Sequence, residues 1–456
     1  MTRILLIYPY FNPPQKKSIF RFPPLGVCYV ASSLKEAGYE VEILDCTFMK
    51  REEAFSQAVK AGADIVGIYS MVTMREECIK FARLLREHSS LLVAGGPLAS
   101  CDPLAFMDDF DVVVRGEGER TMVDITRTFE NDHDFGSISG IVYKRNEANI
   151  NKSDSIIFTS EREHIKDLDL ISFPARDLID NENYIRYSKT RYGNAVTTII
   201  TTRGCPFSCE FCSSAVFGIS YRERSVTNVI DEVEQALSFG YDRIHFADDV
   251  FTLKKERIKR FCEEIKKRNL KFRWECLGRV DSIDSDMAKD MKDAGCERIF
   301  FGIESGDDPV LLLMNKKITV DKARCAVRSA HAAGLLTGAF FILCYPGEND
   351  DTVLRTIKFA TSLPLDYLSF TAPYPIPGTA LYERVKYNIF KEWRAPEDFI
   401  SDHILIYKSD FSERKMRFAI FKGQVQFALR KRLRNRLSLI VATFEILSDI
   451  VFRKMK

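Results

Sequence analysis

The chain has 456 residues, 46% of them apolar and 29% charged, which is ordinary for a folded protein with two or three domains. Its twelve cysteines are scattered apart from one triplet, and a chain of this length needs no disulfide framework. The first residues, MTRILLIYPYF, contain too short an apolar run for a secretory signal. We therefore exclude a secreted disulfide scaffold and expect a reducing cytoplasm.

Residues 1–135 alternate short apolar runs with amphipathic stretches, which predicts a doubly wound, Rossmann-like α/β domain. The runs that indicate buried parallel strands are RILLIYPY, EVEILD, ADIVGIYS, LLVAGG and DVVVRGE, and residues 26–38, 52–62 and 74–88 have helical spacing. Ligands of such sheets bind at the carboxyl ends of the strands. We therefore expect a binding site at 69–73 (YSMVT) and 95–97 (GGP).

Residues 136–190 are more polar and form a connector, in which 140–161 indicates a hairpin. Strand–helix alternation restarts in 191–385. The expected strands are AVTTIITTRG, RIHFADD, FRWECLG, RIFFGIES, TGAFFILCYPG and YLSFTAPYP. Six βα units fall short of the eight of a complete barrel, so we predict a partial (β/α)6 TIM-type barrel with its chemistry at the strand ends.

A loop after the first strand of this barrel carries the sequence RGCPFSCEFCSS, with Cys205, Cys209 and Cys212 spaced C-x3-C-x2-C. Three thiolates can hold three irons of a [4Fe–4S] cluster and leave the fourth iron open to an exogenous ligand. A structural zinc site is the alternative, but it requires a fourth ligand nearby. The next candidates, His245 and Cys262, lie far along the chain inside regular elements. We favour the cluster.

This arrangement resembles the radical S-adenosylmethionine superfamily, in which the open iron chelates the methionine part of the cofactor. The resemblance implies that Cys205, Cys209 and Cys212 bind the cluster and that Phe211 packs near the adenine. Asp248 and Asp249 match the contact to the methionine amino group, with Asp248 expected to point inward because side chains alternate along a strand. Glu304 and Ser305 match the ribose contacts, and 338–348 resembles the segment beside the adenine.

The N-terminal segments resemble the cobalamin-binding domain that is fused to the class B methylase-like branch of this superfamily, and FPARDL at 173–178 fits the same branch. The resemblance implies that Ser70, Thr73, Gly95 and Gly96 embrace the nucleotide tail of the corrinoid, with glycine allowing close approach. A D-x-H-x-x-G motif is missing after Asp45. Many methylases of the branch also lack that histidine, so both a cobalamin site and an empty, vestigial domain stay open.

The resemblance implies that the enzyme cleaves S-adenosylmethionine to a 5′-deoxyadenosyl radical and methylates an unactivated carbon of a small or lipid-like substrate with cobalamin. A flavodoxin- or ferredoxin-type partner would supply electrons, and we expect no nucleic-acid partner. Cys344 is a further catalytic candidate, although a buried structural residue is the more favoured interpretation. Two alternatives stay open: a cyclase or carbon–carbon coupling enzyme without cobalamin, and a non-catalytic iron–sulfur protein.

The region 386–456 is basic, because 411–456 holds 12 Lys or Arg against 3 Asp or Glu while the whole chain has a net charge of +2. Apolar residues step by four and three along one long predicted helix, at Leu429, Leu433, Leu437, Ile440, Phe444, Leu447 and Val451. The apolar segment is too short and too charged to cross a bilayer. We expect the helix either to pack on the barrel, which we favour, or to contact an anionic membrane surface peripherally.

Overall fold

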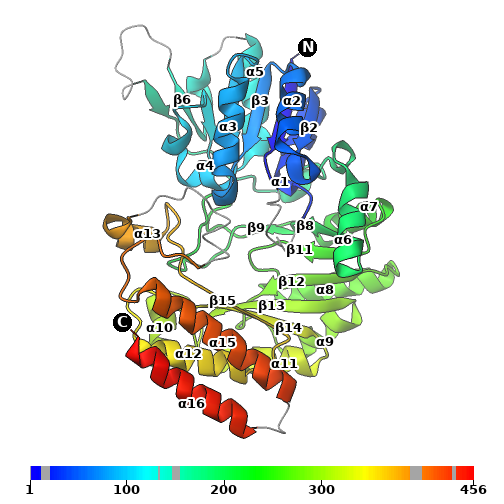
Figure 1. Ribbon diagram of the computed structural model, residues 1–456. Coiled ribbons are helices and arrows are strands. Elements are labelled where there is room, and N and C mark those ends of the chain that lie inside the picture. Colours follow the sequence, from blue (N-terminus) through cyan, green and yellow to red (C-terminus); the bar gives the residue numbers. More distant parts are fainter. Residues whose placement is uncertain are drawn as a thin grey trace.

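The computed structural model describes residues 2–11, 21–131, 134–145, 155–390, 403–433 and 438–455. Two sheets form the core, one in the N-terminal half at the top of Figure 1 and one in the barrel below it. Two long helices, α15 (Glu413–Leu433) and α16 (Ser438–Lys454), lie at the end of the barrel remote from the N-terminal half (Figure 1). The fold therefore has the two predicted α/β units and a helical C-terminal region.

The N-terminal sheet has seven strands in the order β2-β1-β3-β4-β5-β6-β7, of which the first five are parallel. Helices α1 (Leu25–Glu36) and α5 (Gly118–Asn131) cover one face, and α2 (Arg51–Ala61) and α3 (Arg75–Leu85) cover the other. The parallel strands are β1 (Arg3–Tyr8), β2 (Glu40–Asp45), β3 (Ile65–Tyr69), β4 (Leu91–Gly95) and β5 (Val112–Val114). Two helical layers on a parallel sheet confirm the doubly wound prediction.

The predicted hairpin is present as β6 (Ile141–Lys144) and β7 (Ile156–Phe158), which pair in antiparallel fashion. Strand β6 also pairs with β5, so the hairpin extends the edge of the N-terminal sheet. The first part of the connector thus shares the hydrophobic core of this domain. The segment FPARDL follows, and then α6 (Asn181–Tyr192), which leads to the barrel.

The barrel sheet has six parallel strands that follow chain order, β8-β11-β12-β13-β14-β15. They are β8 (Val196–Ile199), β11 (Arg243–Phe246), β12 (Arg273–Gly278), β13 (Cys296–Glu304), β14 (Leu336–Ile342) and β15 (Tyr367–Thr371). Among the paired strands of the described chain, β8 and β15 are the two edges, so the sheet is curved but open. This confirms the partial barrel.

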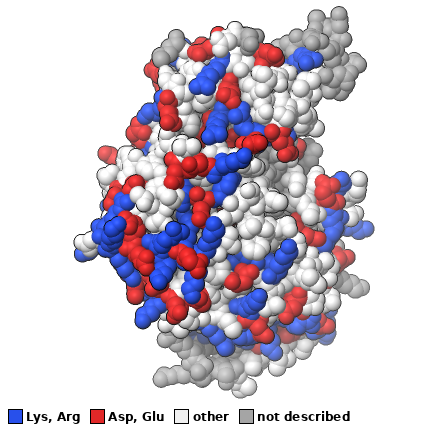
Figure 2. Space-filling view, turned by 180° about the vertical axis from the view of Figure 1, so that it is seen from behind, with Lys and Arg blue, Asp and Glu red and all other residues white. Residues whose placement is uncertain are grey.

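Helices cover the outer face of this sheet, and side-chain caps define where several of them begin. Ser225 accepts a hydrogen bond from the Asn228 amide at the start of α7, and Asn349 forms a capping box at the start of α12. The covering helices are α7 (Val226–Ser238), α8 (Lys255–Lys267), α9 (Ser285–Asp293), α11 (Val320–Ala332) and α12 (Asp350–Ser362). On the face shown in Figure 2, acidic and basic side chains are interspersed.

The C-terminal region corrects the prediction of one long helix, because the predicted apolar stripe is divided between α15 and α16. Helix α15 begins at Glu413, well before Leu429. Its first turns bury Met416, Ala419 and Ile420 in the barrel core. It packs on β15 and α12, while α16 packs on α15 and α12. Leu437 lies outside the described residues. In the described part of the chain, none of the helices combines the length and hydropathy that crossing a membrane requires.

Candidate functional site

One large cavity of about 1360 Å³ lies between the two sheets. The N-terminal domain lines it with residues from the ends of β1, β3 and β4, and the barrel contributes Thr198, Ile200 and Ala247 from the ends of β8 and β11. The cysteine loop contributes Val216 and Phe217 to the same wall. This volume exceeds that of an ordinary small-ligand pocket, about 300–1,000 Å³. The carboxyl ends of both sheets therefore open onto one shared space, as expected for ligands of parallel sheets.

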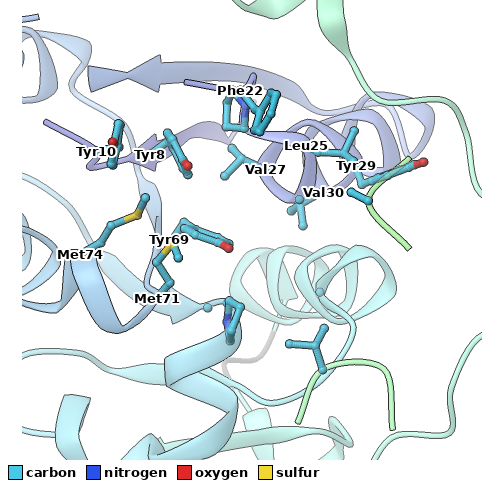
Figure 3. A pocket seen from close by; sticks show the side chains of 18 of the residues that line it. Tyr8, Tyr10, Phe22, Leu25, Val27, Tyr29, Val30, Tyr69, Met71 and Met74 are labelled. Carbon is cyan, nitrogen blue, oxygen red and sulfur yellow. The ribbon is translucent and has the colours of Figure 1, made fainter. Parts of the chain in front are cut away.

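The N-terminal wall of the cavity is aromatic and thioether-rich, as Figure 3 shows. The rings of Tyr8 and Tyr69 lie 5.4 Å apart, and Met71 and Met74 line the space beside them. Burial raises the pKa of Tyr69 to about 12, so its phenol stays neutral at physiological pH. Such a wall suits a large, flat, mainly apolar ligand, because it offers broad contact area and few competing charges.

Three of the four residues predicted to hold a corrinoid line this cavity: Thr73, Gly95 and Gly96. Gly96 has φ +101°, and a Cβ there would lie 2.7 Å from the Ser70 carbonyl oxygen, so the turn after β4 requires glycine. Ser70 differs from expectation because its side chain is fully buried beneath the cavity wall. Its amide donates to the Gly95 carbonyl at 2.7 Å and its carbonyl accepts from Leu98 at 3.1 Å. Ser70 thus holds the glycine turn in place.

The position of the missing histidine is filled by a closed polar cluster. Thr47 occupies it, and both its amide and its hydroxyl donate to the Asp45 carboxylate, at 3.0 Å and 2.6 Å. Tyr184 of α6 donates its hydroxyl to Asp45 at 2.6 Å. Burial raises the pKa of Asp45. These groups satisfy one another, and the cluster offers no imidazole to a ligand in the cavity.

The cysteine loop is closed at its base by two short antiparallel strands, β9 (Thr202–Arg203) and β10 (Arg222–Glu223). Gly204 follows β9 with φ +82°, and a Cβ there would lie 2.3 Å from the Ser220 carbonyl oxygen. The backbone can therefore turn into the loop only through glycine. This geometry places Cys205 at the mouth of the barrel, where the sequence predicted it.

Cys205 and Cys209 are partly buried, and Cys212 reaches the surface. Reduced hydration, with the nearby charge of Asp249, raises the pKa of Cys205 and Cys212, so iron must displace thiol protons when it binds. Among the described residues, no group of three or more Cys, His, Asp or Glu side chains is placed to hold a single metal ion. In a four-iron cluster each thiolate binds a different iron, and three thiolates leave the fourth iron open to another ligand.

The Asp248–Asp249 pair is oriented the opposite way from our expectation. Asp248 is buried and accepts hydrogen bonds from the amides of Thr201 and Thr202 at 2.6 Å and 3.0 Å, and from the Thr201 hydroxyl at 2.5 Å. It anchors the chain that leads into the cysteine loop. Asp249 is exposed and acts electrostatically on Cys205 and Cys212. Of the two carboxylates, Asp249 is thus the one available to a ligand at the cysteine loop.

Glu304 is the last residue of β13, and Ser305 follows it. Glu304 has φ +74°, an uncommon backbone conformation for a residue with a side chain, and pairs with Lys316 at 3.1 Å. Ser305 is fully buried, within hydrogen-bond distance of the Thr356 hydroxyl at 3.0 Å. Backbone strain of this kind clusters at ligand sites, which supports a binding role for Glu304. Ser305 supports the turn.

Two cations beside the cysteine loop were missed by the sequence analysis. Arg279 directly follows β12, and its guanidinium lies 3.5 Å from the centre of the Phe207 ring. Lys316 lies 5.6 Å from the Phe211 ring centre and lowers the pKa of Cys212 against the larger effect of reduced hydration. Both carry the charge that a carboxylate ligand or an anionic cluster requires. The sequence could have indicated Arg279, because it directly follows a predicted barrel strand.

The segments expected to flank the adenine lie together. Phe211 and Tyr345 have ring centres 6.5 Å apart, and the Tyr345 hydroxyl donates to Glu210 at 2.9 Å. Cys344, the catalytic candidate, has no solvent exposure and lies in the barrel core rather than in the cavity wall. Burial raises the pKa of its thiol well above the usual value. The structure therefore places Cys344 as a buried residue.

A buried ionic cluster joins the two domains beside the cavity. Glu117 and Glu119, at the start of α5, pair with Arg203 at 2.7 Å and 2.5 Å, and Arg222 pairs with Glu117 at 2.9 Å. Burial opposes the charge of Glu117, but Arg203 and Arg222 hold its pKa below the usual value. The sequence analysis had not assigned these carboxylates a role, because their partners lie about a hundred positions away.

Two α/β units thus face each other across a mainly apolar cavity, and a loop with three cysteines contributes Val216 and Phe217 to its wall. This combination is the one expected of an enzyme that uses an iron–sulfur cluster together with a large, mainly apolar ligand. Known proteins agree with this class. The profile of the "Radical SAM superfamily" matches residues 199–360, and that of the "B12 binding domain" matches residues 17–126.

Individual relatives cover nearly the whole chain. "Uncharacterized methyltransferase PH0819" of Pyrococcus horikoshii is 32% identical over 452 residues, covering 95% of this chain and 94% of its own. The anaerobic magnesium-protoporphyrin IX monomethyl ester cyclase of Cereibacter sphaeroides is 28% identical over 401 residues, covering 84% of this chain and 64% of its own. The solved structure of the cobalamin-dependent radical enzyme OxsB with aqua-cobalamin matches with a TM-score of 0.77 at 18% identity, covering 99% of this chain and 72% of that one.

The chain belongs to the radical S-adenosylmethionine enzymes that carry an N-terminal B12-binding domain. Membership brings a [4Fe–4S] cluster and S-adenosylmethionine as cofactors, and the N-terminal domain brings cobalamin. The residues fit these groups: three free thiols stand on one loop at the barrel mouth, and the glycine turn after β4 opens onto the cavity. Contacts between individual residues and each cofactor stay predictions.

Proposed function

We propose that this enzyme methylates an unactivated carbon of a small or lipid-like substrate. The observation that supports this proposal is the shared cavity, since its walls come from both the glycine turn of the cobalamin-type domain and the cysteine loop. A methyl donor and a radical generator must act on one substrate carbon, so both must reach a common space. The name of the Pyrococcus horikoshii relative, a methyltransferase, points the same way.

Cys205, Cys209 and Cys212 would hold the cluster, Asp249, Glu304 and Phe211 would contact S-adenosylmethionine, and Thr73, Gly95 and Gly96 would contact cobalamin. When bound, these groups supply reductive cleavage of S-adenosylmethionine to a 5′-deoxyadenosyl radical, hydrogen abstraction and methyl transfer. The protein contributes binding, orientation and exclusion of water. A low-potential partner of the flavodoxin or ferredoxin type would provide the electrons that this family requires.

The chain's own residues perform two tasks in this scheme. Asp248 and the Gly204 turn fix the entry to the cysteine loop, and the Glu117–Arg203 pair fixes the N-terminal domain over it. The apolar walls keep water from a reactive carbon radical, which otherwise would be quenched by competing groups. Mainly apolar lining also favours an apolar substrate. For the same reason we infer that the enzyme works at the periphery of a membrane.

A second candidate function is ring closure or carbon–carbon coupling without methyl transfer. It is favoured by the cyclase relative, and by the closed Asp45–Thr47–Tyr184 cluster, which provides no imidazole. Under this alternative the N-terminal domain would bind substrate instead of cobalamin.

The test of the proposed function uses anaerobically reconstituted enzyme with S-adenosylmethionine bearing a deuterated methyl group. We expect 5′-deoxyadenosine and, with extracts of apolar metabolites, a product heavier by one deuterated methyl. A product without the label, formed together with 5′-deoxyadenosine, would favour the cyclase-type alternative. Absence of 5′-deoxyadenosine from protein with a full cluster would contradict both and favour the non-catalytic iron–sulfur hypothesis.

A further inference from the structure

Helix α16 is bound to the rest of the protein through Phe452, which is fully buried in the barrel core, and through its polar residues. The Glu445 carboxylate accepts hydrogen bonds from Gln426 at 2.9 Å and from the Arg430 Nε at 3.0 Å. Asp449 pairs with Lys422 at 2.9 Å, and Lys422 is only 2% exposed. Both acidic residues of α16 therefore form ion pairs with α15, Glu445 with Arg430 and Asp449 with Lys422.

The opposite face of α16 presents apolar side chains to solvent. Its six large members are between 46% and 78% exposed: Leu439, Ile440, Ile446, Leu447, Ile450 and Val451. Their spacing of one, six, one, three and one places them on one side of the helix, which runs along the outer edge of the barrel in Figure 1. An amphipathic helix packed on a domain ordinarily turns this face inward. A contiguous exposed apolar face therefore indicates an interaction surface.

The charges around this face are basic. Lys431 and Arg432 end α15 and Lys454 lies at the end of α16, all three exposed, whereas Arg430 and Arg453 are paired with Glu445 and Asp351. The acids that would offset them on α16 are bound on its inner side. An apolar stripe with cations near both ends matches the chemistry of an anionic lipid surface, with acyl chains below and headgroups beside it.

We propose that the outward face of α16 docks on an anionic lipid bilayer and holds the enzyme at the membrane surface. Self-association through the same face would bring the basic helix ends of two copies together and is opposed by their repulsion. The docking face lies on the side of the barrel remote from the N-terminal domain (Figure 1). Docking through this face would therefore keep the N-terminal domain away from the membrane surface.

The test is flotation of the purified full chain with vesicles of phosphatidylcholine alone or of equal parts phosphatidylcholine and phosphatidylglycerol. We expect binding to the anionic vesicles, weakened by high salt because the basic residues are screened. The joint substitution Ile446→Ser, Leu447→Ser and Ile450→Ser should reduce binding to anionic vesicles by about tenfold or more, since it removes the inserted apolar area. These side chains are exposed, so the thermal midpoint should stay close to that of the unmodified protein.

Leu104→Ser is the matched control, because Leu104 is 56% exposed but lies in the N-terminal domain. It should leave vesicle binding unchanged. Failure of the unmodified chain to bind anionic vesicles, or equal binding by the triple variant, would overturn the proposal. A concentration-dependent dimer that the triple variant abolishes, without vesicle binding, would assign the face to self-association instead. The assay needs no substrate or turnover, so its outcome is independent of the proposed reaction.

Discussion

The carboxyl ends of the two sheets carry different chemistry. The N-terminal sheet presents Tyr8, Tyr69, two methionines and the Gly95–Gly96 turn. Around the mouth of the barrel sheet, charged and sulfur groups prevail: three cysteines, Asp249, Arg279 and the Glu304–Lys316 pair. One side thus offers contact area to a large flat ligand, and the other offers donors to iron and to an ionic cofactor.

The two sides also differ in how the backbone is used. In the N-terminal half the left-handed positions beside the cavity are glycines, such as Gly96 and Gly116, which allow close approach. Beside the barrel mouth, left-handed backbone also occurs at a residue with a side chain, Glu304, which pairs with Lys316. A strained residue with a side chain can hold a charged group in a fixed position, whereas a glycine lets a ligand approach the backbone closely. The predictions below test this difference.

The largest effect should come from the cysteine loop. Joint substitution of Cys205, Cys209 and Cys212 by alanine should abolish iron binding and 5′-deoxyadenosine formation, because the loop then has no donor for the cluster. Iron analysis of the reconstituted protein measures this. Cys325→Ala is the control, since Cys325 is exposed on α11 and should have no effect. Full iron content in the triple variant would place the cluster elsewhere.

The next largest effect should come from the buried ionic cluster that joins the two domains. Glu117→Gln removes one buried charge and leaves Arg222 without its carboxylate partner, so unfolding should become easier by about 3–5 kcal/mol. Urea denaturation measures this loss in the free energy of unfolding. Glu163→Gln, which breaks an exposed pair with Lys166, should cost less than about 1 kcal/mol. Equal stability of the Glu117→Gln and Glu163→Gln variants would show that the buried ionic cluster does not stabilise the contact between the domains.

The barrel side should also respond to pH through Glu348, which is buried at the β14–α12 loop. Burial raises its pKa from 4.5 to about 7. Because the folded value is the higher one, the protein is most stable below pH 4.5 with respect to this group and loses stability as pH rises through 7. The full loss is roughly 3 kcal/mol. Glu348→Gln should flatten this dependence between pH 5 and 8 in thermal unfolding, and an unchanged slope would contradict it.

The smallest effect should come from filling space on the N-terminal side. A Cβ at Gly95 would lie 4.0 Å from the nearest atom, on Val114, so a side chain can begin there without a clash at a position that lines the cavity. Gly95→Leu should weaken hydroxocobalamin binding by about tenfold, seen in a visible-absorbance titration, while leaving iron content unchanged. Gln57→Leu, on the exposed side of α2, adds the same bulk outside the cavity and should bind as the original does.

Much of the fold could be predicted, because buried parallel strands and amphipathic helices leave strong periodic patterns. The strand EVEILD coincides with β2, and β11 begins at Arg243 as expected. The orientation of the Asp248–Asp249 pair could not be predicted in the same way. β11 ends at Phe246, so the alternation of side chains no longer applies two residues later.

Contacts between distant segments account for the other differences. Glu117 and Arg203 are 86 positions apart and belong to different domains, so no local pattern relates them. Helix α16 has a regular apolar pattern, but its two acids pair with the buried Lys422 and the partly buried Arg430 of α15, which leaves the apolar side facing out. A periodicity predicts that a helix has two faces. It does not predict which face is covered when a neighbour provides matching charges.

We propose above all that one chain holds an iron–sulfur cluster and a corrinoid at the same time. We would reconstitute the full chain anaerobically with iron, sulfide and hydroxocobalamin, desalt it, and quantify both metals with the visible spectrum. The account predicts about four irons and about one cobalt per chain, retained together. About four irons with no retained cobalt would contradict it, and would make the N-terminal domain a substrate-binding or vestigial unit.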